Sequence, residues 1–297
     1  MRKVGLNIDM DYEFLENQSM AEYTTFKVGG AAKRLYKVYS VDGLKEVIDI
    51  CGDEKPIIIG NGSNLLVSDK GLEPPVIVIG NGFDKITVEG ETITAEAGAL
   101  LSKVAKAAME NDLEGAEFAS GIPGSIGGAI YMNAGAYGGE IKNIVKSVDV
   151  IKDGKLITLR GNEMDFGYRH SRAMQEDMII VSVVFSLAKG DKDDIVAKMN
   201  DFNSRRRDKQ PLEYPSAGST FKRPEGYFAG KLIMDSGLAG YRVGGAMVSP
   251  KHCGFVINYE NATATDVYEL ILHVQEVVKE KFGVMLEPEV KLMGDFS

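Results

Sequence analysis

The segment GAEFASGIPGSIGGAIYMNAGAYGG, residues 115–139, constrains this chain more than any other because it holds eight glycines. Glycine permits positive φ and close backbone approach, but it loses more conformational entropy on folding than any other residue. The backbone therefore either lies against a bulky phosphate-bearing ligand with its N–H groups aimed at the anion, or forms a glycine-rich connection between strands. The Ile, Ala, Tyr and Met residues between the glycines favour an ordered, buried segment.

The composition is that of an ordinary globular enzyme. The chain has 297 residues, of which 44% are hydrophobic and 26% charged, enough for two domains. A net charge of −9 argues against a nucleic-acid-binding protein, which is usually basic. An anionic substrate could still bind at a local cluster of basic residues. The same residues could instead be the solvated end of a helix, where positive charge favours the helix dipole. The candidate cluster is Arg205, Arg206, Arg207, Lys209, Lys222 and Arg223.

The cysteines and histidines predict neither a disulfide framework nor a metal site. Cys51 and Cys253 form no CxxC pair, and the three histidines lack metal-ligand spacing. The N-terminus, MRKVGLNIDMDYEF, has no apolar core of signal-peptide length, and no apolar run in the chain approaches the length of a membrane span. We therefore expect a cytoplasmic protein with no membrane partner, and the sequence indicates no obligate protein partner.

Hydrophobic periodicity predicts a mixture of helices, strands and hairpins. Residues 1–20 resemble an amphipathic helical lead-in, and Asp42 is the expected N-cap of the next helix. Strands without a strict βα alternation favour an α+β fold over a doubly wound parallel sheet. The expected strands are 34–38, 56–59, 75–80 and 178–187, the hairpins 86–97 and 148–159, and the later helices 99–111, 192–207 and 264–282. A domain boundary is expected near 188–208.

Two glycine turns are candidate anion sites. PIIIGNGSNLLVSD, residues 56–69, begins like a dinucleotide fingerprint, but Leu65 replaces the third glycine and no helical pattern follows, which argues against a Rossmann fold. The turn is then an anion nest or a plain turn. In GIPGSIGGA, residues 121–129, we expect Ser125 and the N–H groups around Gly124 and Gly127 to hold a pyrophosphate. Together the two turns suit one extended dinucleotide.

Three later motifs contain candidate reacting groups. Arg169, in GYRHSRAM, either clamps a carboxylate and stabilises developing negative charge or forms a surface salt bridge. Ser219 follows Gly218 in a proline-bounded loop and lacks the G-x-S-x-G context of a nucleophile, so proton donation suits it better. Glu289 precedes a pattern that predicts a strand returning to the core, where it is a buried carboxylate or ordinary surface charge.

Taken in order, these segments resemble the UDP-N-acetylenolpyruvoylglucosamine reductase family over nearly the whole chain, from TTFKVGGAA at 24–32 to LEPEV at 286–290. Several motifs in one order are far more specific than any of them alone. The motifs are IIIGNGSNLLVSD, GIPGSIGGAIYMNAGAYGGE, GYRHSR, YPSAGSTFKRP, AGKLIMDSGLAGYRVGGAMVS and KHCGFVIN.

The resemblance implies a two-part FAD-binding region of the vanillyl-alcohol-oxidase type and a smaller α+β substrate-binding domain. The expected lead-in is 1–20, the FAD-binding region is 21–190 with parts at about 21–75 and 76–190, and the substrate-binding domain is 191–297. Within that domain, residues 286–297 are expected to return to the active site.

The resemblance also implies an activity in peptidoglycan precursor synthesis. NADPH reduces non-covalently bound FAD, and UDP-N-acetylglucosamine enolpyruvate then occupies the same cleft. A hydride goes to the enolpyruvyl C3 and a proton to C2, which gives UDP-N-acetylmuramate. The family's catalytic arginine falls on Arg169, its proton-donating serine on Ser219 and its glutamate on Glu289, which either binds the carboxylate when protonated or orients the arginine.

The expected FAD contacts lie in the glycine segments. They are Ile59, Gly60, Asn61, Gly62, Ser63, Asn64 and Leu65 in the first turn, with Gly121, Ile122, Pro123, Gly124, Ser125, Gly127, Gly128, Ala129, Asn133 and Gly135 in the second segment.

The expected substrate contacts are basic and aromatic. The stretch 202–219 is compact and resembles the shorter subtype of the family, which lacks an extra loop whose tyrosine covers the UDP moiety. Tyr137, Tyr168 and Tyr214 remain candidates for the uridine, and the candidates for the diphosphate are Arg206, Lys222 and Arg223.

Two other functions compete with the reductase. A flavin-dependent oxidase would often tether its flavin covalently, for which His170 and Cys51 are poorly placed candidates. A non-catalytic binder of flavin or nucleotide sugar would share the glycine turns but would not need Ser219 or Glu289.

Overall fold

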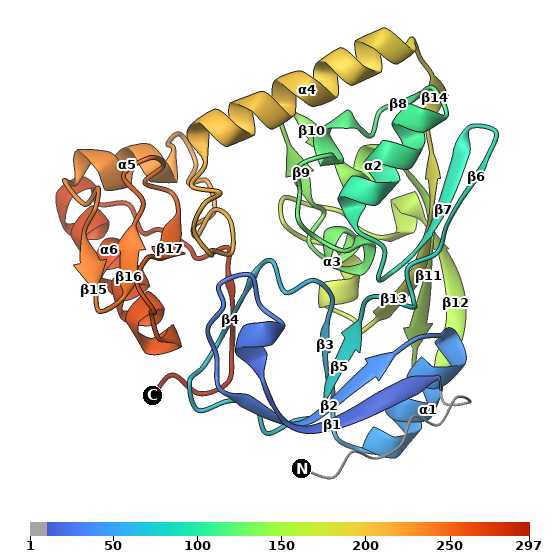
Figure 1. Ribbon diagram of the computed structural model, residues 1–297, viewed down its shortest axis with the longest axis horizontal. Coiled ribbons are helices and arrows are strands. Elements are labelled where there is room, and N and C mark those ends of the chain that lie inside the picture. Colours follow the sequence, from blue (N-terminus) through green and yellow to red (C-terminus); the bar gives the residue numbers. More distant parts are fainter. Residues whose placement is uncertain (1–10) are drawn as a thin grey trace.

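The computed structural model describes residues 11–297, and its first part is a four-stranded sheet in the order β1-β2-β5-β3 (Figure 1). β1 is antiparallel to β2, whereas β2, β5 and β3 are parallel neighbours. Helix α1 (Val41–Cys51) buries Leu44 and Val47 toward this sheet. The strands are β1 (Tyr12–Ser19), β2 (Ala31–Val38), β5 (Val76–Ile79) and β3 (Ile57–Ile59).

The second part is a five-stranded antiparallel sheet in the order β12-β11-β13-β7-β6. Both predicted hairpins are confirmed, β6–β7 and β11–β12, the latter turning at Asp153–Gly154, where both residues have positive φ. Helices α2 (Leu101–Glu110) and α3 (Ile126–Tyr131) pack against this sheet. The strands are β6 (Ile86–Glu89), β7 (Thr92–Glu96), β11 (Val145–Lys152), β12 (Lys155–Arg160) and β13 (Ile179–Ser186).

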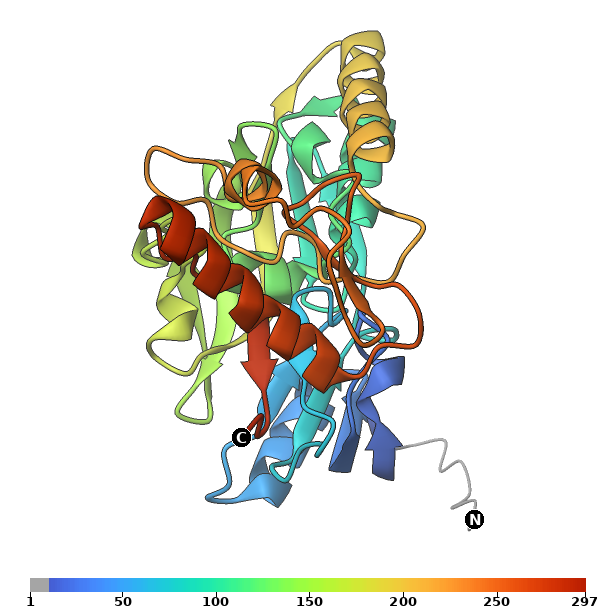
Figure 2. The ribbon, with the colours of Figure 1, turned by 90° about the vertical axis from the view of Figure 1, so that its left-hand side faces the viewer.

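The C-terminal part contains a small three-stranded sheet and two helices, and the shorter helix packs on the longer one. Helix α6 (Ala264–Phe282) packs across the sheet, and Figure 2 shows it in front of the other elements. Helix α4 (Lys192–Lys209) runs along the top of Figure 1 and joins the C-terminal part to the rest. The remaining elements here are α5 (Ala229–Asp235), β15 (Arg242–Val243), β16 (Ala246–Val248) and β17 (Val256–Asn258).

The mixture of parallel and antiparallel strands confirms the predicted α+β class. Helix α6 begins with a capping box: the Thr263 hydroxyl accepts from Asp266 N–H, and the Asp266 carboxylate accepts from Thr263 N–H. Gly283 ends the helix in the left-handed conformation, at φ 70°. Among residues 11–297, no helix is long and apolar enough to span a bilayer.

Two local predictions are wrong. The expected helical lead-in is strand β1 where the structure describes it, because pairing Leu15 with Leu35 of β2 outweighs the local helical pattern; residues 1–10 lie outside the described part. The N-cap of α1 is Ser40, whose Oγ accepts from Gly43 N–H, and not Asp42. Asp42 lies in the first turn instead, where its charge favours the helix dipole.

The C-terminal part is attached to the N-terminal half by three kinds of contact. Strand β18 (Lys291–Met293) returns to pair in parallel with β4 (Leu65–Val67). The core around α6 includes Phe26 and Leu66, both wholly buried. Asp69 accepts hydrogen bonds from the first N–H groups of α6, Ala264 at 2.9 Å and Thr265 at 2.8 Å. Packing therefore continues across the boundary expected from the sequence.

We predict that Asp69→Ala lowers the free energy of unfolding by about 1–2 kcal/mol, since it leaves two helix N–H groups without their acceptor. Urea unfolding measures the change. Asp42→Ala is the matched control, an exposed first-turn carboxylate that caps nothing, and it should cost less than about 0.5 kcal/mol. Equal losses in the two variants would contradict the assigned cap.

Candidate active site

The two glycine turns of the sequence lie against each other. A Cβ on Gly60 would sit 2.0 Å from Ser125 Oγ, so only glycine fits there. The side-chain amide of Asn61 donates to the Pro123 carbonyl. Gly62 adopts a positive φ of 60°, and a Cβ there would meet the Tyr23 carbonyl at 1.8 Å. The fold thus brings residues 60–64 and 121–128, far apart in sequence, to one place.

The second turn offers an unpaired polar group. Ser125 is 3% exposed, and its Oγ has no hydrogen-bond partner within residues 11–297. Within the same part of the chain, the backbone N–H groups of Gly62 and Ser63 also donate to no protein acceptor. A buried hydroxyl and free N–H groups beside glycines that leave no room for Cβ atoms fit a pyrophosphate.

One predicted donor in this turn is not available. The Gly127 N–H donates to the Ala97 carbonyl at 2.8 Å, and the Ile126 N–H donates to Ala99 at 2.8 Å. Residues 125–127 run beside the chain that leaves β7, with an isolated bridge between Leu100 and Ser125, and this pairing uses both N–H groups. Of the N–H groups predicted around Gly127 to hold an anion, those of Ile126 and Gly127 are therefore not available.

Arg169 lies in a tight turn whose first and last residues are hydrogen-bonded to each other. Gly167 and His170 exchange backbone hydrogen bonds of 3.1 and 3.3 Å, and Arg169 adopts a φ of +53°, which is uncommon for a residue other than glycine. The turn is stabilised from outside by Asn133, whose Nδ2 donates to Gly167 O at 2.8 Å, and by Ser171, whose Oγ donates to Tyr131 O at 2.8 Å.

The guanidinium of Arg169 pairs with the carboxylate of Glu289. Arg169 Nε donates to Glu289 Oε1 at 2.6 Å, and the two side chains are 19% and 15% exposed. Arg169 Nη2 also approaches the Gly135 carbonyl, at 3.4 Å. The bond to Glu289 leaves other guanidinium N–H groups free for a substrate carboxylate.

The backbone around Glu289 connects the remaining candidate groups. Its N–H donates to the Thr220 carbonyl at 2.8 Å, which brings in the chain beside Ser219, an exposed residue. Its carbonyl accepts from Asn64 Nδ2 at 3.1 Å. Asn64 therefore joins the first glycine turn to the segment that contains Glu289.

Three predicted substrate residues, Tyr168, Lys222 and Arg223, line a cavity of about 520 Å³. The Tyr168 hydroxyl accepts from Arg223 N–H at 3.2 Å, and Lys222 forms an ion pair with Glu287. The guanidinium of Arg223 lies 4.0 Å from the centre of the Phe228 ring. The guanidinium carbon of Arg169 lies 5.1 Å from the centre of the Tyr168 ring. Because Tyr168 lines the cavity, the cavity adjoins the Arg169 turn.

Arg206 and Tyr214, the other two predicted substrate residues, do not line this cavity. Tyr214 packs on Tyr259, with ring centres 5.3 Å apart. Arg206 lies on α4 beside Gly121, where a Cβ would meet its Nη1 at 3.0 Å. Burial lowers the pKa of Arg206, although the nearby Tyr137 hydroxyl acts in the opposite direction.

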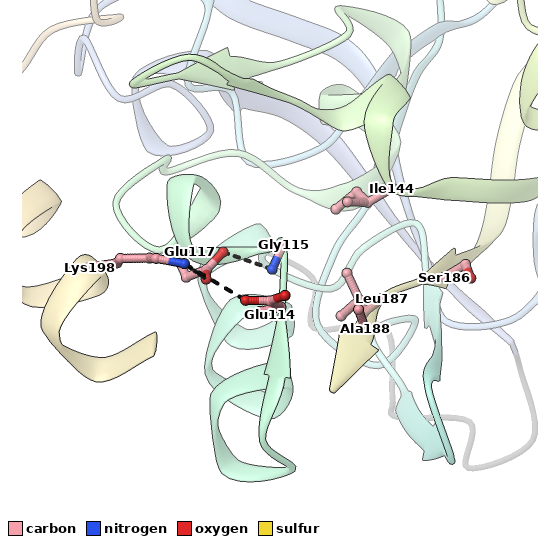
Figure 3. Close-up of a pocket in the computed structure, with 8 residues that line it drawn as sticks. All are labelled: Glu114, Gly115, Glu117, Ile144, Ser186, Leu187, Ala188 and Lys198. Atoms are coloured by element: carbon pink, nitrogen blue, oxygen red, sulfur yellow. Dashed lines mark hydrogen bonds and ion pairs between the residues drawn. The ribbon is translucent and has the colours of Figure 1, made fainter. Parts of the chain in front are cut away.

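A second cavity, of about 480 Å³, contains none of the predicted reacting groups (Figure 3). Glu117, which is 6% exposed, accepts from Gly115 N–H at 2.8 Å and from Lys198 Nζ at 3.5 Å. Lys198 also lies 3.8 Å from Glu114. These ion pairs attach α4, the helix that contains Arg206, to the start of the glycine segment. The cavity therefore lies where α4 packs against that segment.

Sequence reasoning missed the part played by buried amides. Asn133 is completely buried, and both donors of its side chain bond to protein groups, Gly167 O and Glu140 Oε2. Hydrogen bonds from Lys142 and from Asn133 hold the pKa of Glu140 below its ordinary value. A polar Asn within a glycine-rich, otherwise apolar run is the available signal, although by itself it predicts only a ligand contact.

Neither candidate for a covalent flavin tether is favoured. Cys51 is 6% exposed and packs in the core beneath α1, where burial raises its pKa. His170 closes the Arg169 turn through its backbone.

Comparison with known proteins gives consistent matches along the chain. The family model for an FAD binding domain matches residues 32–160, and that for the C-terminal domain of UDP-N-acetylenolpyruvoylglucosamine reductase matches residues 210–293. The reductase of Clostridium botulinum is 48% identical over 292 residues, 97% of this chain and 96% of that protein. The reductase of Lachnoclostridium phytofermentans is 51% identical over 286 residues, 94% of this chain and 92% of that protein.

A solved structure agrees with these matches. UDP-N-acetylenolpyruvylglucosamine reductase from Thermus caldophilus superposes with a TM-score of 0.83 at 35% identity. The superposition covers 95% of this chain and 99% of the other.

We predict that Gly60→Ala lowers the free energy of unfolding by about 1–3 kcal/mol, since its new methyl group overlaps Ser125 Oγ. In the ligand-free protein, in which all three variants are compared, Ser125→Ala alone should be nearly neutral, because it removes an unpaired buried hydroxyl. In the double variant Ser125→Ala should restore part of the lost stability. Strictly additive effects in urea unfolding of the three proteins would show that the two turns do not touch.

Proposed function

The chain belongs to the UDP-N-acetylenolpyruvoylglucosamine reductase family and is an FAD-dependent oxidoreductase, and we propose that NADPH is its reductant. We also propose that its active site is formed by the two glycine turns, the Arg169 turn and the C-terminal segment. The observation that carries this proposal is the 2.6 Å pair between Arg169 and Glu289, which adjoins the glycine turns through Asn64.

We propose that the pyrophosphate of FAD lies between the glycine turns, where the unpaired Ser125 hydroxyl and the free N–H groups of Gly62 and Ser63 would bind its oxygens. The missing Cβ atoms at Gly60 and Gly62 let the backbone approach the ligand. When bound, FAD supplies the two-electron transfer between NADPH and the enolpyruvyl double bond of UDP-N-acetylglucosamine enolpyruvate.

The proposed role of Arg169 is electrostatic. Reduction at C3 of the enolpyruvyl group places negative charge at C2 and, through conjugation, on the attached carboxylate. A fixed guanidinium beside that carboxylate lowers the energy of the transition state more than that of the ground state. The partial burial of the side chain strengthens this interaction, because fewer water molecules screen it.

The proposed role of Glu289 is to orient Arg169. Its carboxylate already accepts from Arg169 Nε, and this geometry supports the orienting role over direct binding of the substrate carboxylate. Ser219 is proposed to donate the proton to C2. It is a weak acid, but protonation of a strongly basic carbon does not require a strong one, and its loop is joined to Glu289 through Thr220.

We propose that the 520 Å³ cavity takes the UDP part of the substrate. Its cationic groups, Lys222 and Arg223, suit the diphosphate, and Tyr168 offers an aromatic face to the uridine. The roles of Arg206 in diphosphate binding and of Tyr214 in uridine binding stay predictions. The product, UDP-N-acetylmuramate, assigns the protein to peptidoglycan precursor synthesis, and its cytoplasmic location stays a prediction.

The purified protein should carry non-covalent FAD and should oxidise NADPH rapidly only when UDP-N-acetylglucosamine enolpyruvate is present. Absorbance at the NADPH band measures turnover, and NADH under the same conditions is the control for coenzyme preference. Bound flavin without substrate-dependent turnover would contradict the proposed reaction.

Ser219→Ala should leave flavin reduction by NADPH unchanged and slow reoxidation by the enolpyruvyl sugar nucleotide by about 10²–10⁴-fold, the usual range for loss of a general acid. Stopped-flow absorbance separates the two half-reactions. Ser216→Ala, in the same loop, is the matched control and should leave both rates unchanged. Equal slowing of both half-reactions in Ser219→Ala would rule out its role as the C2 proton donor.

A further inference from the structure

Asn133 is a completely buried polar residue between α3 and the short hairpin β9 (Gly135–Ala136) and β10 (Gly139–Glu140). Its side chain makes three hydrogen bonds: Nδ2 donates to Gly167 O at 2.8 Å and to Glu140 Oε2 at 3.3 Å, and Oδ1 accepts from Lys142 N–H at 3.1 Å. Both side-chain donors are thus already used, and no N–H of this amide remains for a cofactor.

The shortest of these bonds ends on the turn that presents Arg169. Gly167 is the first residue of that turn, and Arg169 occupies the left-handed region at φ +53°. A residue with a side chain is held in this region at a cost, and it persists there only where surrounding contacts fix the backbone. Asn133 supplies such a contact from the glycine segment.

The other bonds of Asn133 fix Asn133 itself. Glu140 accepts from Nδ2 and pairs with Lys142 Nζ at 2.6 Å, while Lys142 donates its backbone N–H to Oδ1. The amide is therefore oriented by the hairpin on one side and holds the Arg169 turn on the other.

We propose that Asn133 is a positioning residue for the reduction of the enolpyruvyl group: by binding the Gly167 carbonyl, it holds the Arg169 guanidinium where the substrate carboxylate is bound. This inference rests on the proposed function of Arg169. It assigns Asn133 a task in the second half-reaction only, since NADPH presents no enolpyruvyl carboxylate to Arg169.

A purely conformational role is the alternative. Asn133 has a φ of +43°, and Asn is enriched at positive φ. Asn133→Gly separates the two, because glycine adopts this backbone freely but removes the amide. Asn261→Gly is the matched control, an exposed Asn at φ +55° in the C-terminal part.

Asn133→Gly should retain FAD and its rate of reduction by NADPH, while reoxidation by UDP-N-acetylglucosamine enolpyruvate slows by about 10–100-fold, as expected for a displaced catalytic group. In a double variant with Arg169→Ala, the change at Asn133 should add no further loss. Asn261→Gly should leave both half-reactions unchanged. Wild-type reoxidation by Asn133→Gly, equal slowing of both half-reactions, or multiplicative losses in the double variant would overturn the proposal.

Hydrogen exchange of the flavin-free protein tests the clamp independently of turnover. The Gly167 and His170 amides, which bond to each other's carbonyls, should exchange about tenfold faster in Asn133→Gly than in the wild type. Unchanged exchange of these two amides would overturn the role proposed for Asn133. A wild-type protein that did not turn over would instead contradict the proposed function, and the exchange measurement would still test Asn133.

If Asn133→Gly does not fold, Asn133→Asp replaces it. Aspartate keeps the shape of the residue but faces the Gly167 carbonyl with an acceptor, so the same selective loss of reoxidation is expected. A wild-type rate in this variant would overturn the proposal.

Discussion

The hydrogen bond between Arg169 Nε and Glu289 Oε1 is the interaction on which the rest of the site depends. A partly buried ion pair contributes little net stability, because the desolvation of both charges offsets their attraction. Its importance is positional: it joins the turn between β12 and β13 to the last segment of the chain. Each partner is in turn held by an amide, Arg169 through Asn133 and Glu289 through Asn64.

The fold explains how residues so far apart in sequence keep this geometry. Strand β18 pairs with β4 just beyond Glu289, and Asn64 immediately precedes β4. Asp69, just after β4, caps α6, and Phe26 and Leu66 extend the core of the C-terminal part. The first glycine turn is therefore attached to the segment that contains Glu289. This attachment would align the proposed flavin site with the proposed substrate site.

The parts predictable from the sequence are those set by local chemistry. The Asp153–Gly154 turn, the Thr263–Asp266 capping box and the Gly283 helix end each follow from a few neighbouring residues. Predictions that ignored pairing with distant segments were wrong, such as the helical lead-in before β2 and the availability of the Ile126 and Gly127 N–H groups. Arg169, Ser219 and Glu289 are candidates through motif order. The sequence marks Asn133 as a polar residue in a glycine-rich run, but the backbone carbonyls that Asn64 and Asn133 bind carry no sequence signal.

A crystal structure of the Ser219→Ala variant with FAD and UDP-N-acetylglucosamine enolpyruvate is the most direct test of this account. We expect the enolpyruvyl carboxylate to accept hydrogen bonds from the Arg169 guanidinium, with the bonds from Arg169 to Glu289 and from Asn133 to Gly167 retained. A carboxylate bound elsewhere, with Arg169 released from Glu289 and turned toward solvent, would contradict it.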